Sequence, residues 1–476
     1  MNFNSFSYIL LFLPLVYCVV QIARRTTYYK APQLVVLLAS LLFYSFAKPS
    51  NLFYLVLSIL VNWALAHWIA NKTGLARKRV LQFGLTLNIF YLCSFKYTNF
   101  ILSNIGGIQV KVHQFAPALA LPLGISFFTL SQIMYLVDCY EDIIPPSSLF
   151  DHATFVSFFP YVISGPLSRT KRILHQFPAL NDHTGPTAEP LARALYLFSL
   201  GLVKKVVLAD VCSKAADYGF NNIAHLSALE AWCFATAYAL QIYFDFSGYS
   251  DMAIATAHLF GIEIPRNFDS PLCASSIINY WQRWHISLTS FITTYIYTPI
   301  VRSFSRATLL VSAIATVLAM TIAGLWHGPN WTYVSFGAIH GVALAINQCW
   351  RKWKMPSIPA PISWLMTLVI FDTAFVFFRA PDLHTAILYI AQMINWHMPL
   401  GISAFRQMNG TGGMAFIFAA GQCSAVIAAF LCKNSEQMTK AFTPTRTNCA
   451  ITATYLLMSL LYLNSNVAQP FIYFGF

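Results

Sequence analysis

Two histidines stand in surroundings that suit proton-transfer chemistry. His327 lies in the motif Gly324-Leu-Trp-His-Gly328, at the end of an apolar run and just before Pro329. His285 lies 42 positions earlier (327 − 285 = 42), in Tyr280-Trp-Gln-Arg-Trp-His285. An ionisable side chain at membrane depth is costly and usually functional. Because imidazole titrates near neutral pH, it suits general acid–base catalysis. The two motifs predict a two-histidine reaction centre inside a membrane protein.

Each histidine has a predicted role and an alternative. His327 would take the proton of an attacking hydroxyl group, with Gly324 and Gly328 allowing close approach. Its alternative is a helix-end histidine bonded to a neighbouring carbonyl. His285 would orient an acyl carbonyl or donate to the developing oxyanion, and Arg283 would contact phosphate groups of a nucleotide-bearing donor. The alternative for this motif is an aromatic belt at the membrane surface.

Other polar residues near these motifs are candidates for binding or for structure. We assign substrate binding to Trp284, Trp326, Asn330 and Asp245. Asp245 and Asp251 follow an apolar run, where helix capping and a turn around Gly248 are an equally good interpretation. Lys204 and Lys205 lie inside an apolar run, and we expect a carboxylate such as Asp210 or Asp245 to pair with them. A third histidine, His340, is predicted to pack inside a helix.

Apolar runs position these residues. Runs that cross, or nearly cross, about 30 Å of hydrocarbon span 6–22, 32–47, 51–70, 80–95, 117–137, 191–211, 229–248, 307–323, 331–349, 361–378, 413–432 and 449–464. Basic residues gather after the odd-numbered runs, which places those ends in the cytoplasm and the N-terminus outside. Runs 307–323 and 331–349 then form a hairpin with His327 at its tip, about 25 Å from the cytoplasmic end.

Two segments do not fit a simple span. Residues 154–168 are apolar but contain Pro160, Gly165 and Pro166, which predicts a re-entrant segment surrounded by protein or by a water-filled cavity. Residues 249–300 hold too many polar groups for lipid and too many aromatic ones for an open loop. We expect an amphipathic, partly buried element on the cytoplasmic side.

Composition excludes several other classes. Of 476 residues, 57% are hydrophobic and 9% are charged, against about 25% charged in soluble domains. The net charge of +13 comes from basic residues in short loops, so we expect no nucleic-acid partner. The ten cysteines are scattered singly, which predicts neither disulfides nor a metal site. We predict one integral-membrane domain, 1–476, with N-terminal helices (1–115), a catalytic core (116–350) and C-terminal helices (351–476).

A set of motifs resembles those of the membrane-bound O-acyltransferase family, and within it the bacterial alginate O-acetyltransferase branch. The motifs follow one another in the same order as in the family. The matching stretches are Pro122–Thr129, Phe158–Pro160, Gly201–Asp210, Tyr238–Ala253, Arg283–Leu288, Gly324–Gly328, Val376–Ala380 and Phe471–Phe474. The resemblance implies an all-α polytopic protein of about 11–12 transmembrane helices, with re-entrant and interfacial helices around a central funnel. The family's essential histidine maps onto His327, and its second polar position onto His285.

The resemblance also implies an activity. Family members move an acyl group, usually acetyl from acetyl-CoA, to hydroxyls of an exported polymer such as alginate, cellulose or peptidoglycan, often with a periplasmic partner enzyme. We therefore expect a multi-pass O-acetyltransferase of the bacterial inner membrane, with acetyl-CoA as donor and no bound cofactor. The family's usual Arg-Asp pair is replaced by Thr293 and Thr294, a departure that bears on donor docking and partner choice. The alternative function is a polysaccharide or lipid-intermediate transporter with proton-relay histidines.

Overall fold

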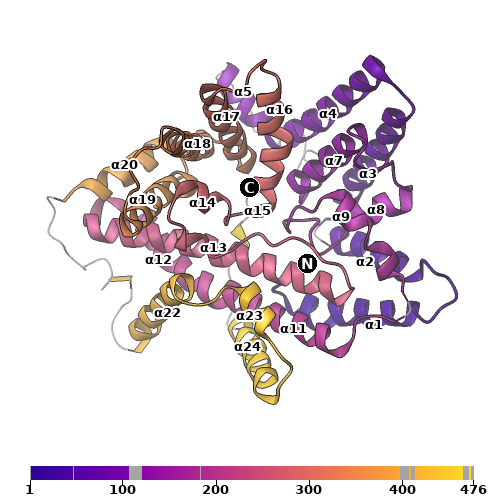
Figure 1. The fold of residues 1–476 in the computed structure, drawn as a ribbon. Coiled ribbons are helices and arrows are strands. Elements are labelled where there is room, and N and C mark those ends of the chain that lie inside the picture. The colour runs from indigo at the N-terminus through magenta and orange to yellow at the C-terminus, as the bar shows by residue number, and fades with distance from the viewer. Residues whose placement is uncertain are drawn as a thin grey trace. The chain divides into compact units, whose positions relative to one another are not determined.

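The computed structural model describes residues 2–46, 48–106, 121–182, 184–396, 407–408, 413–464 and 471–472. Helices are the regular elements in these ranges (Figure 1). The chain forms two compact units, and each is described by itself. Unit 1 comprises Met1–Phe198, Ser250–Arg266 and Thr443–Ala450, and unit 2 comprises Ser199–Tyr249, Asn267–Phe442 and Ile451–Phe476.

Unit 1 is built mainly from the N-terminal helices. They are η1 (Ser7–Phe12), α1 (Leu13–Ala23), α2 (Ala31–Ser45), α3 (Pro49–Ala70), α4 (Gly74–Lys96), α5 (Thr98–Gly106), α7 (Ile125–Tyr140), α8 (Leu149–Ser157), α9 (Thr170–Leu174), α10 (Phe177–Leu180) and most of α11 (Ala188–Val203). Helices α3, α4 and α7 share a core that includes Leu65, Tyr135 and Leu136. The buried amides of Asn62 and Asn88 bond each other across α3 and α4, at 3.2 and 2.7 Å. Such side-chain bonds hold helices together where hydrocarbon offers no hydrophobic driving force.

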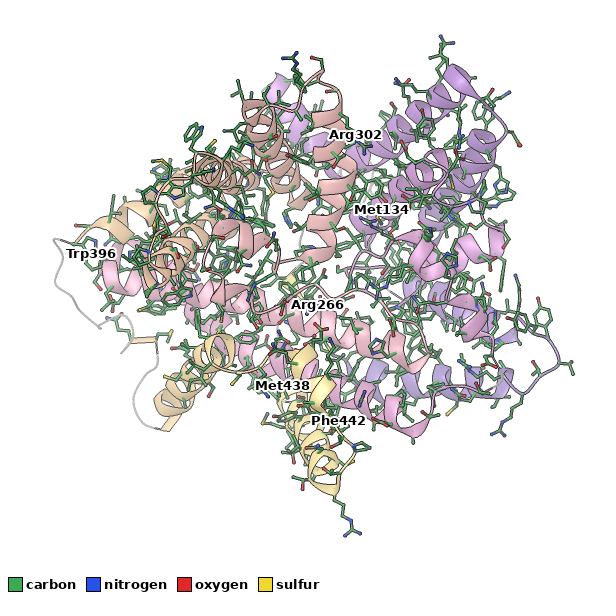
Figure 2. The ribbon with its side chains drawn as sticks, viewed as in Figure 1. Met134, Arg266, Arg302, Trp396, Met438 and Phe442 are labelled. Atoms are coloured by element: carbon green, nitrogen blue, oxygen red, sulfur yellow. The ribbon has the colours of Figure 1, made fainter. Side chains whose placement is uncertain are left out.

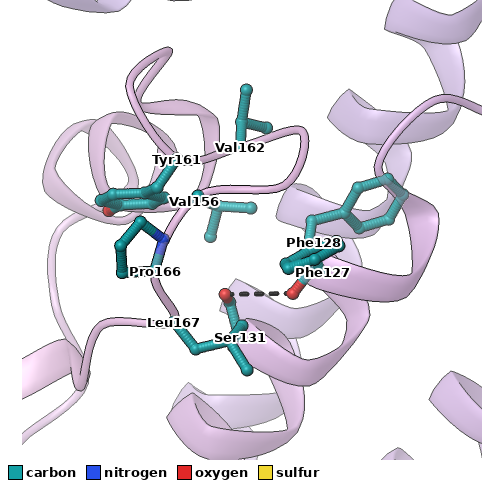
Figure 3. A pocket seen from close by; sticks show the side chains of 9 residues that line it. Phe127, Phe128, Ser131, Val156, Tyr161, Val162, Pro166 and Leu167 are labelled. Atoms are coloured by element: carbon teal, nitrogen blue, oxygen red, sulfur yellow. Dashed lines mark hydrogen bonds between the residues drawn. The ribbon is translucent and has the colours of Figure 1, made fainter. Parts of the chain in front are cut away.

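The segment predicted to be broken, 154–168, is helical only at its start, in 154–157. Helix α8 ends at Ser157, and residues 158–168 run as buried turns. Gly165 is needed here because a Cβ atom would lie 2.8 Å from the Pro160 carbonyl oxygen. Figure 3 shows the segment against α7, where Ser131 Oγ donates to the Phe127 carbonyl at 3.2 Å beside a pocket too narrow for a water molecule. The break and its burial are confirmed, and the prediction that it is re-entrant remains one.

Unit 2 contains the other helices of the described residues. Two of them, α13 and α24, lie partly in unit 1. The helices of unit 2 are η3 (Lys204–Ala209), α12 (Asp210–Asn221), η4 (Ile223–His225), α13 (Ala228–Leu259), η5 (Pro271–Cys273), α14 (Ile277–Trp281), α15 (Ile286–Phe291), η6 (Ile292–Tyr297), α16 (Thr298–Arg302), α17 (Leu309–His327), α18 (Trp331–Lys352), α19 (Ala360–Arg379), α20 (Leu383–Ile394), α22 (Gly413–Phe430), α23 (Ser435–Ala441) and α24 (Arg446–Asn464). Figure 2 adds the side chains, with Arg302 labelled at the end of α16 and Trp396 just beyond α20. The predicted amphipathic element 249–300 is, after α13, a series of short helices with mixed burial.

Helix α13 corrects one expectation. The sequence suggested a turn around Gly248, but the helix continues to Leu259 with Asp245, Gly248 and Asp251 inside it. A Cβ atom at position 248 would lie 2.6 Å from the Gly201 carbonyl oxygen. The glycine therefore permits close helix packing, and the capping interpretation of these two aspartates is wrong.

Each predicted apolar run coincides with a helix in the described residues, although residue 47 of the second run and residues 117–120 of the fifth run lie outside them. Within the described residues, three helices are long and apolar enough to cross a membrane by themselves, namely α3, α17 and α19. Shorter apolar helices cover Ser7–Ala23, Ala31–Ser45, Leu383–Ile394 and Ala420–Phe430. The all-helical architecture is confirmed, whereas the central funnel stays a prediction.

Candidate active site

Helix α17 carries His327 on its buried face. Leu310, Ile314, Leu318 and Ile322 recur every fourth residue and are 45–69% exposed. The adjacent row, formed by Ala315, Ala319, Ala323 and His327, is at most 5% exposed. Residues four apart share a helix face, so one face suits lipid and the other packs inside unit 2. The imidazole ends the buried row, in the last turn of the helix.

Aromatic rings surround the His327 imidazole. The ring centroids of Trp326, Phe378 and Phe336 lie 5.0, 5.1 and 6.0 Å from its own, all in edge-to-face arrangements. Trp326 is only 9% exposed. This environment excludes most water, which strengthens electrostatic interactions with a reacting group.

The predicted hairpin is confirmed, since α17 ends at His327 and α18 begins at Trp331. The two glycines of the motif make room for α18. A Cβ atom on Gly324 would lie 2.8 Å from Gly337 Cα, and one on Gly328 would meet the Tyr333 ring at 2.6 Å. Small residues of this kind allow two helix backbones to approach closely in a membrane. The predicted close approach at these two glycines is therefore made by residues of α18.

Asn330 closes the tip of the hairpin. Its side-chain oxygen accepts the Thr332 backbone N–H at 3.1 Å, which caps α18. Its amide nitrogen donates to the Pro381 carbonyl at 2.7 Å, which ties the tip to the start of α20. These bonds give Asn330 a structural function, and its assignment to substrate binding remains a prediction.

His285 is held in a different and more constrained way. Its backbone adopts the left-handed conformation (φ 42°), uncommon for a non-glycine residue, where α15 begins. The neighbouring backbone is fixed by Asn267, whose carbonyl accepts the Ile286 N–H at 2.9 Å and whose side chain accepts the Ser287 hydroxyl at 2.6 Å. The imidazole is completely buried and meets Phe246 edge-on at 4.6 Å.

Burial also sets the charge of His285. This residue lies outside the predicted spans, and desolvation lowers the pKa of its imidazole to about 3. The ring is therefore neutral at physiological pH. A neutral imidazole can donate one N–H hydrogen bond, which fits the predicted role of steadying a carbonyl.

The two histidines belong to one aromatic cluster. Phe378, beside His327, is 5.6 Å from Phe375, which is 5.5 Å from Trp284, the residue before His285. Trp284 is 2% exposed and also stacks on Tyr280 at 5.6 Å. Trp284 therefore packs between the motif that contains His285 and the phenylalanines next to His327. Arg283 is half-buried, its carbonyl accepting the Asp269 N–H at 3.0 Å, and its phosphate contact remains a prediction.

Asp245 belongs to a buried ion cluster. Lys205 Nζ pairs with the Asp245 carboxylate and lies 3.4 Å from Asp210 Oδ1, with all three side chains at most 3% exposed. Asp245 also accepts the Ile472 backbone N–H at 2.9 Å. The expected pairing of Lys205 is confirmed with both carboxylates, while Lys204 donates to the Ser435 hydroxyl. A substrate contact of Asp245 remains a prediction.

Of the aromatic neighbours of His327, Trp326 was assigned to the site from the sequence, whereas Phe336 and Phe378 were not. Phe336 contacts His327 and also His340 (4.8 Å), so it lies between two imidazoles. His340 is fully buried as predicted, and neither ring nitrogen has a hydrogen-bond partner in the described ranges. The spacing of Phe371, Phe375 and Phe378 is helical and marks one face of α19, but that pattern also fits ordinary core residues. No cluster that could hold a metal ion lies within the described residues.

Comparison with known proteins decides the family. The model of the membrane-bound O-acyltransferase family matches residues 74–378. The chain belongs to this family. It is 35% identical to the peptidoglycan O-acetyltransferase of Helicobacter pylori, over 100% of this chain and 97% of that protein. It is 33% identical to the probable alginate O-acetylase AlgI of Azotobacter vinelandii, over 83% of this chain and 78% of that protein. It is 29% identical to the teichoic acid D-alanyltransferase of Streptococcus thermophilus, over 49% and 58%.

Membership establishes the broad activity. The protein is a membrane-bound O-acyltransferase, an enzyme and a multi-pass membrane protein. The family model covers both His285 and His327. The predicted family, the polytopic helical fold and the enzymatic class are confirmed.

Proposed function

We propose that this membrane-bound O-acyltransferase transfers acetyl groups from acetyl-CoA to hydroxyls of a cell-envelope polysaccharide, across the bacterial inner membrane. The observation that carries the proposal is the buried imidazole of His327 at the tip of the α17–α18 hairpin, in a family of acyltransferases. Arg283, on the side where we place the donor, would contact its phosphate groups.

In the proposed reaction, His327 accepts the proton of the acceptor hydroxyl as its oxygen attacks the acetyl carbonyl carbon. A C–O bond forms, the C–S bond of the thioester breaks, and the leaving thiolate takes up the proton. The neutral His285 donates a hydrogen bond to the carbonyl oxygen as its negative charge develops. A thioester is already activated, so positioning and a single base suffice. Trp284 and Trp326 form the walls of the site, with Asn330 and Asp245 at its edges.

For the acceptor, we favour peptidoglycan. The Helicobacter pylori relative named for that acceptor aligns along the whole chain, whereas the alginate relatives align over about four fifths of it. An exported polysaccharide such as alginate is the second candidate, supported by 33–34% identity to several probable alginate O-acetylases. In either case, the attacking hydroxyl belongs to the polymer itself or to a periplasmic partner enzyme that passes the acetyl group to the polymer.

The test compares His327→Ala with wild type in a deletion strain at equal expression. Acetate released by mild base is measured separately from purified peptidoglycan and from exported polysaccharide. Since a general base contributes about 10²–10⁴ in rate, we expect acetylation of one polymer to fall at least about 100-fold. The matched control is His384→Ala, which removes an exposed histidine of α20.

Unchanged acetylation in His327→Ala would refute the proposal. The deletion strain also separates it from a transporter, because a lost transporter leaves polymer inside the cell. A lost acetyltransferase leaves polymer that is exported without acetate.

A further inference from the structure

Unit 1 contains a pocket that the acyl-transfer chemistry does not use. It has a volume of ≈ 190 Å³ and lies among α2, α8 and α10, lined by Tyr29, Lys30, Gln33, Asp151, Phe177 and Asn181 among others. This volume is several times the roughly 30 Å³ that a water molecule occupies in the liquid. It is below the range of about 300–1,000 Å³ of pockets that enclose drug-sized ligands. The pocket therefore suits a compact polar group.

Buried amides give the pocket a rigid polar base. Asn181 donates to Gln33 Oε1 at 3.1 Å and accepts the Gln33 backbone N–H at 3.2 Å. Gln33 Nε2 donates to Asp151 Oδ1 at 2.8 Å. Gln33 and Asn181 are at most 2% exposed. The network fixes the Asp151 carboxylate before any ligand arrives, which lowers the entropic cost of binding.

Opposite charges line the same pocket. Lys30 Nζ lies 3.7 Å from Asp151 Oδ1, and their side chains remain 41% and 27% exposed. An exposed pair at this separation contributes little stability. A ligand with both a negative and a positive group can therefore insert beside the pair, with its anion on Lys30 and its cation on Asp151. Charge complementarity thus points to a zwitterion.

An apolar stripe continues from this pocket along α2. Leu34, Leu38 and Leu42 recur every fourth residue and are 38%, 57% and 54% exposed. They begin one turn after Lys30, and Tyr28 and Tyr29 before it are 59% and 51% exposed. Exposed tyrosines next to a basic residue mark a membrane surface, and an exposed leucine stripe faces acyl chains. A headgroup in the pocket would thus have its acyl chain alongside these leucines.

We propose that this pocket binds the headgroup of a phospholipid with a primary amine, of the phosphatidylethanolamine class. The phosphate contacts Lys30 and the ammonium contacts Asp151, while one acyl chain lies along the leucine stripe of α2. The basic residues that follow the first apolar run place this end of α2 at the cytoplasmic leaflet. The inference does not depend on the acetyltransferase activity.

The test measures lipid retained by the full-length protein. Protein purified in detergent is mixed with equal amounts of phosphatidylethanolamine, phosphatidylcholine and phosphatidylglycerol, and bound lipid is counted by native mass spectrometry. We expect phosphatidylethanolamine to be retained at least about tenfold over the other two. Tenfold corresponds to about 1.4 kcal/mol, the scale of one charge-assisted hydrogen bond. Lys30→Gln should reduce retention of all phosphate lipids, and Asp151→Asn should remove the preference for phosphatidylethanolamine over phosphatidylglycerol.

Asp142→Asn is the matched control, because it breaks another ion pair of unit 1, with Arg77, that does not line the pocket. It should keep the wild-type preference. Equal retention of the three lipids by wild type, or wild-type selectivity in both pocket variants, would overturn the proposal. Free phosphoethanolamine that raises the Tm as much as the lipid does would also overturn it, because the ligand would then be a soluble phosphate ester.

Discussion

Replacement of Lys205 by Met tests the buried ion cluster of unit 2. The cluster holds one ammonium and two carboxylates, from Asp210 and Asp245, with every side chain at most 3% exposed. In Lys205→Met both carboxylates lose their counter-ion in a water-poor environment. Removing one partner of a buried pair costs about 3–5 kcal/mol. With about 2.1 cal/mol/K of unfolding entropy per residue, a 476-residue chain loses about 1 °C of Tm per kcal/mol, so we expect the Tm to fall by about 3–5 °C.

The assay is thermal unfolding of the purified protein in detergent, followed by loss of the folded monomer on size-exclusion chromatography. Lys204→Met is the control, because Lys204 is half-buried and donates to the Ser435 hydroxyl. Its loss should cost only about 1 kcal/mol.

A double variant, Lys205→Met with Asp245→Asn, should recover part of the lost stability, since it removes one of the uncompensated charges. Equal losses in Lys205→Met and Lys204→Met would refute this reasoning. So would a double variant less stable than Lys205→Met alone, because the two residues would then not be coupled.

Three further predictions concern packing and charge. Gly324→Ala should abolish folded protein or activity, because the new methyl group would lie 2.8 Å from Gly337 Cα; wild-type yield and acetylation would contradict this. His340→Phe should leave the Tm unchanged or raise it by a few degrees, because it removes two buried nitrogens without hydrogen-bond partners in the described residues; a large fall in Tm would disprove it. Asp142→Asn tests a pH effect. The hydrogen bond from Arg77 lowers the pKa of the Asp142 carboxyl in the folded protein. The stability contributed by this carboxylate is therefore present above its unfolded-state pKa and is lost as the pH falls through its folded-state pKa. The Tm difference between wild type and Asp142→Asn should therefore shrink on acidification from pH 7, and a constant difference would count against it.

Much of the architecture was predictable because local patterns dictate it. Apolar runs predicted the helices, and the glycine and proline residues of 154–168 predicted a break, because backbone geometry depends on nearby residues. The hairpin with His327 at its tip followed in the same way. The pairing of Lys205 with Asp210 and Asp245 followed from electrostatics alone, since an ammonium in an apolar run needs a carboxylate.

Tertiary structure decided what the local patterns left open. The sequence around Gly248 predicts a turn, but Gly248 lies inside α13. The backbone at Gly201 packs so close to it that a Cβ atom would clash. The rings around His327 come from α17, α18 and α19, and a helical stripe of phenylalanines does not reveal which polar group it will enclose. The sequence therefore determined the helices, the reactive residue types and the charge pairs, because these depend on residue chemistry and local spacing. The surroundings of each histidine depended on helix packing, because long-range contacts select which faces of the helices meet.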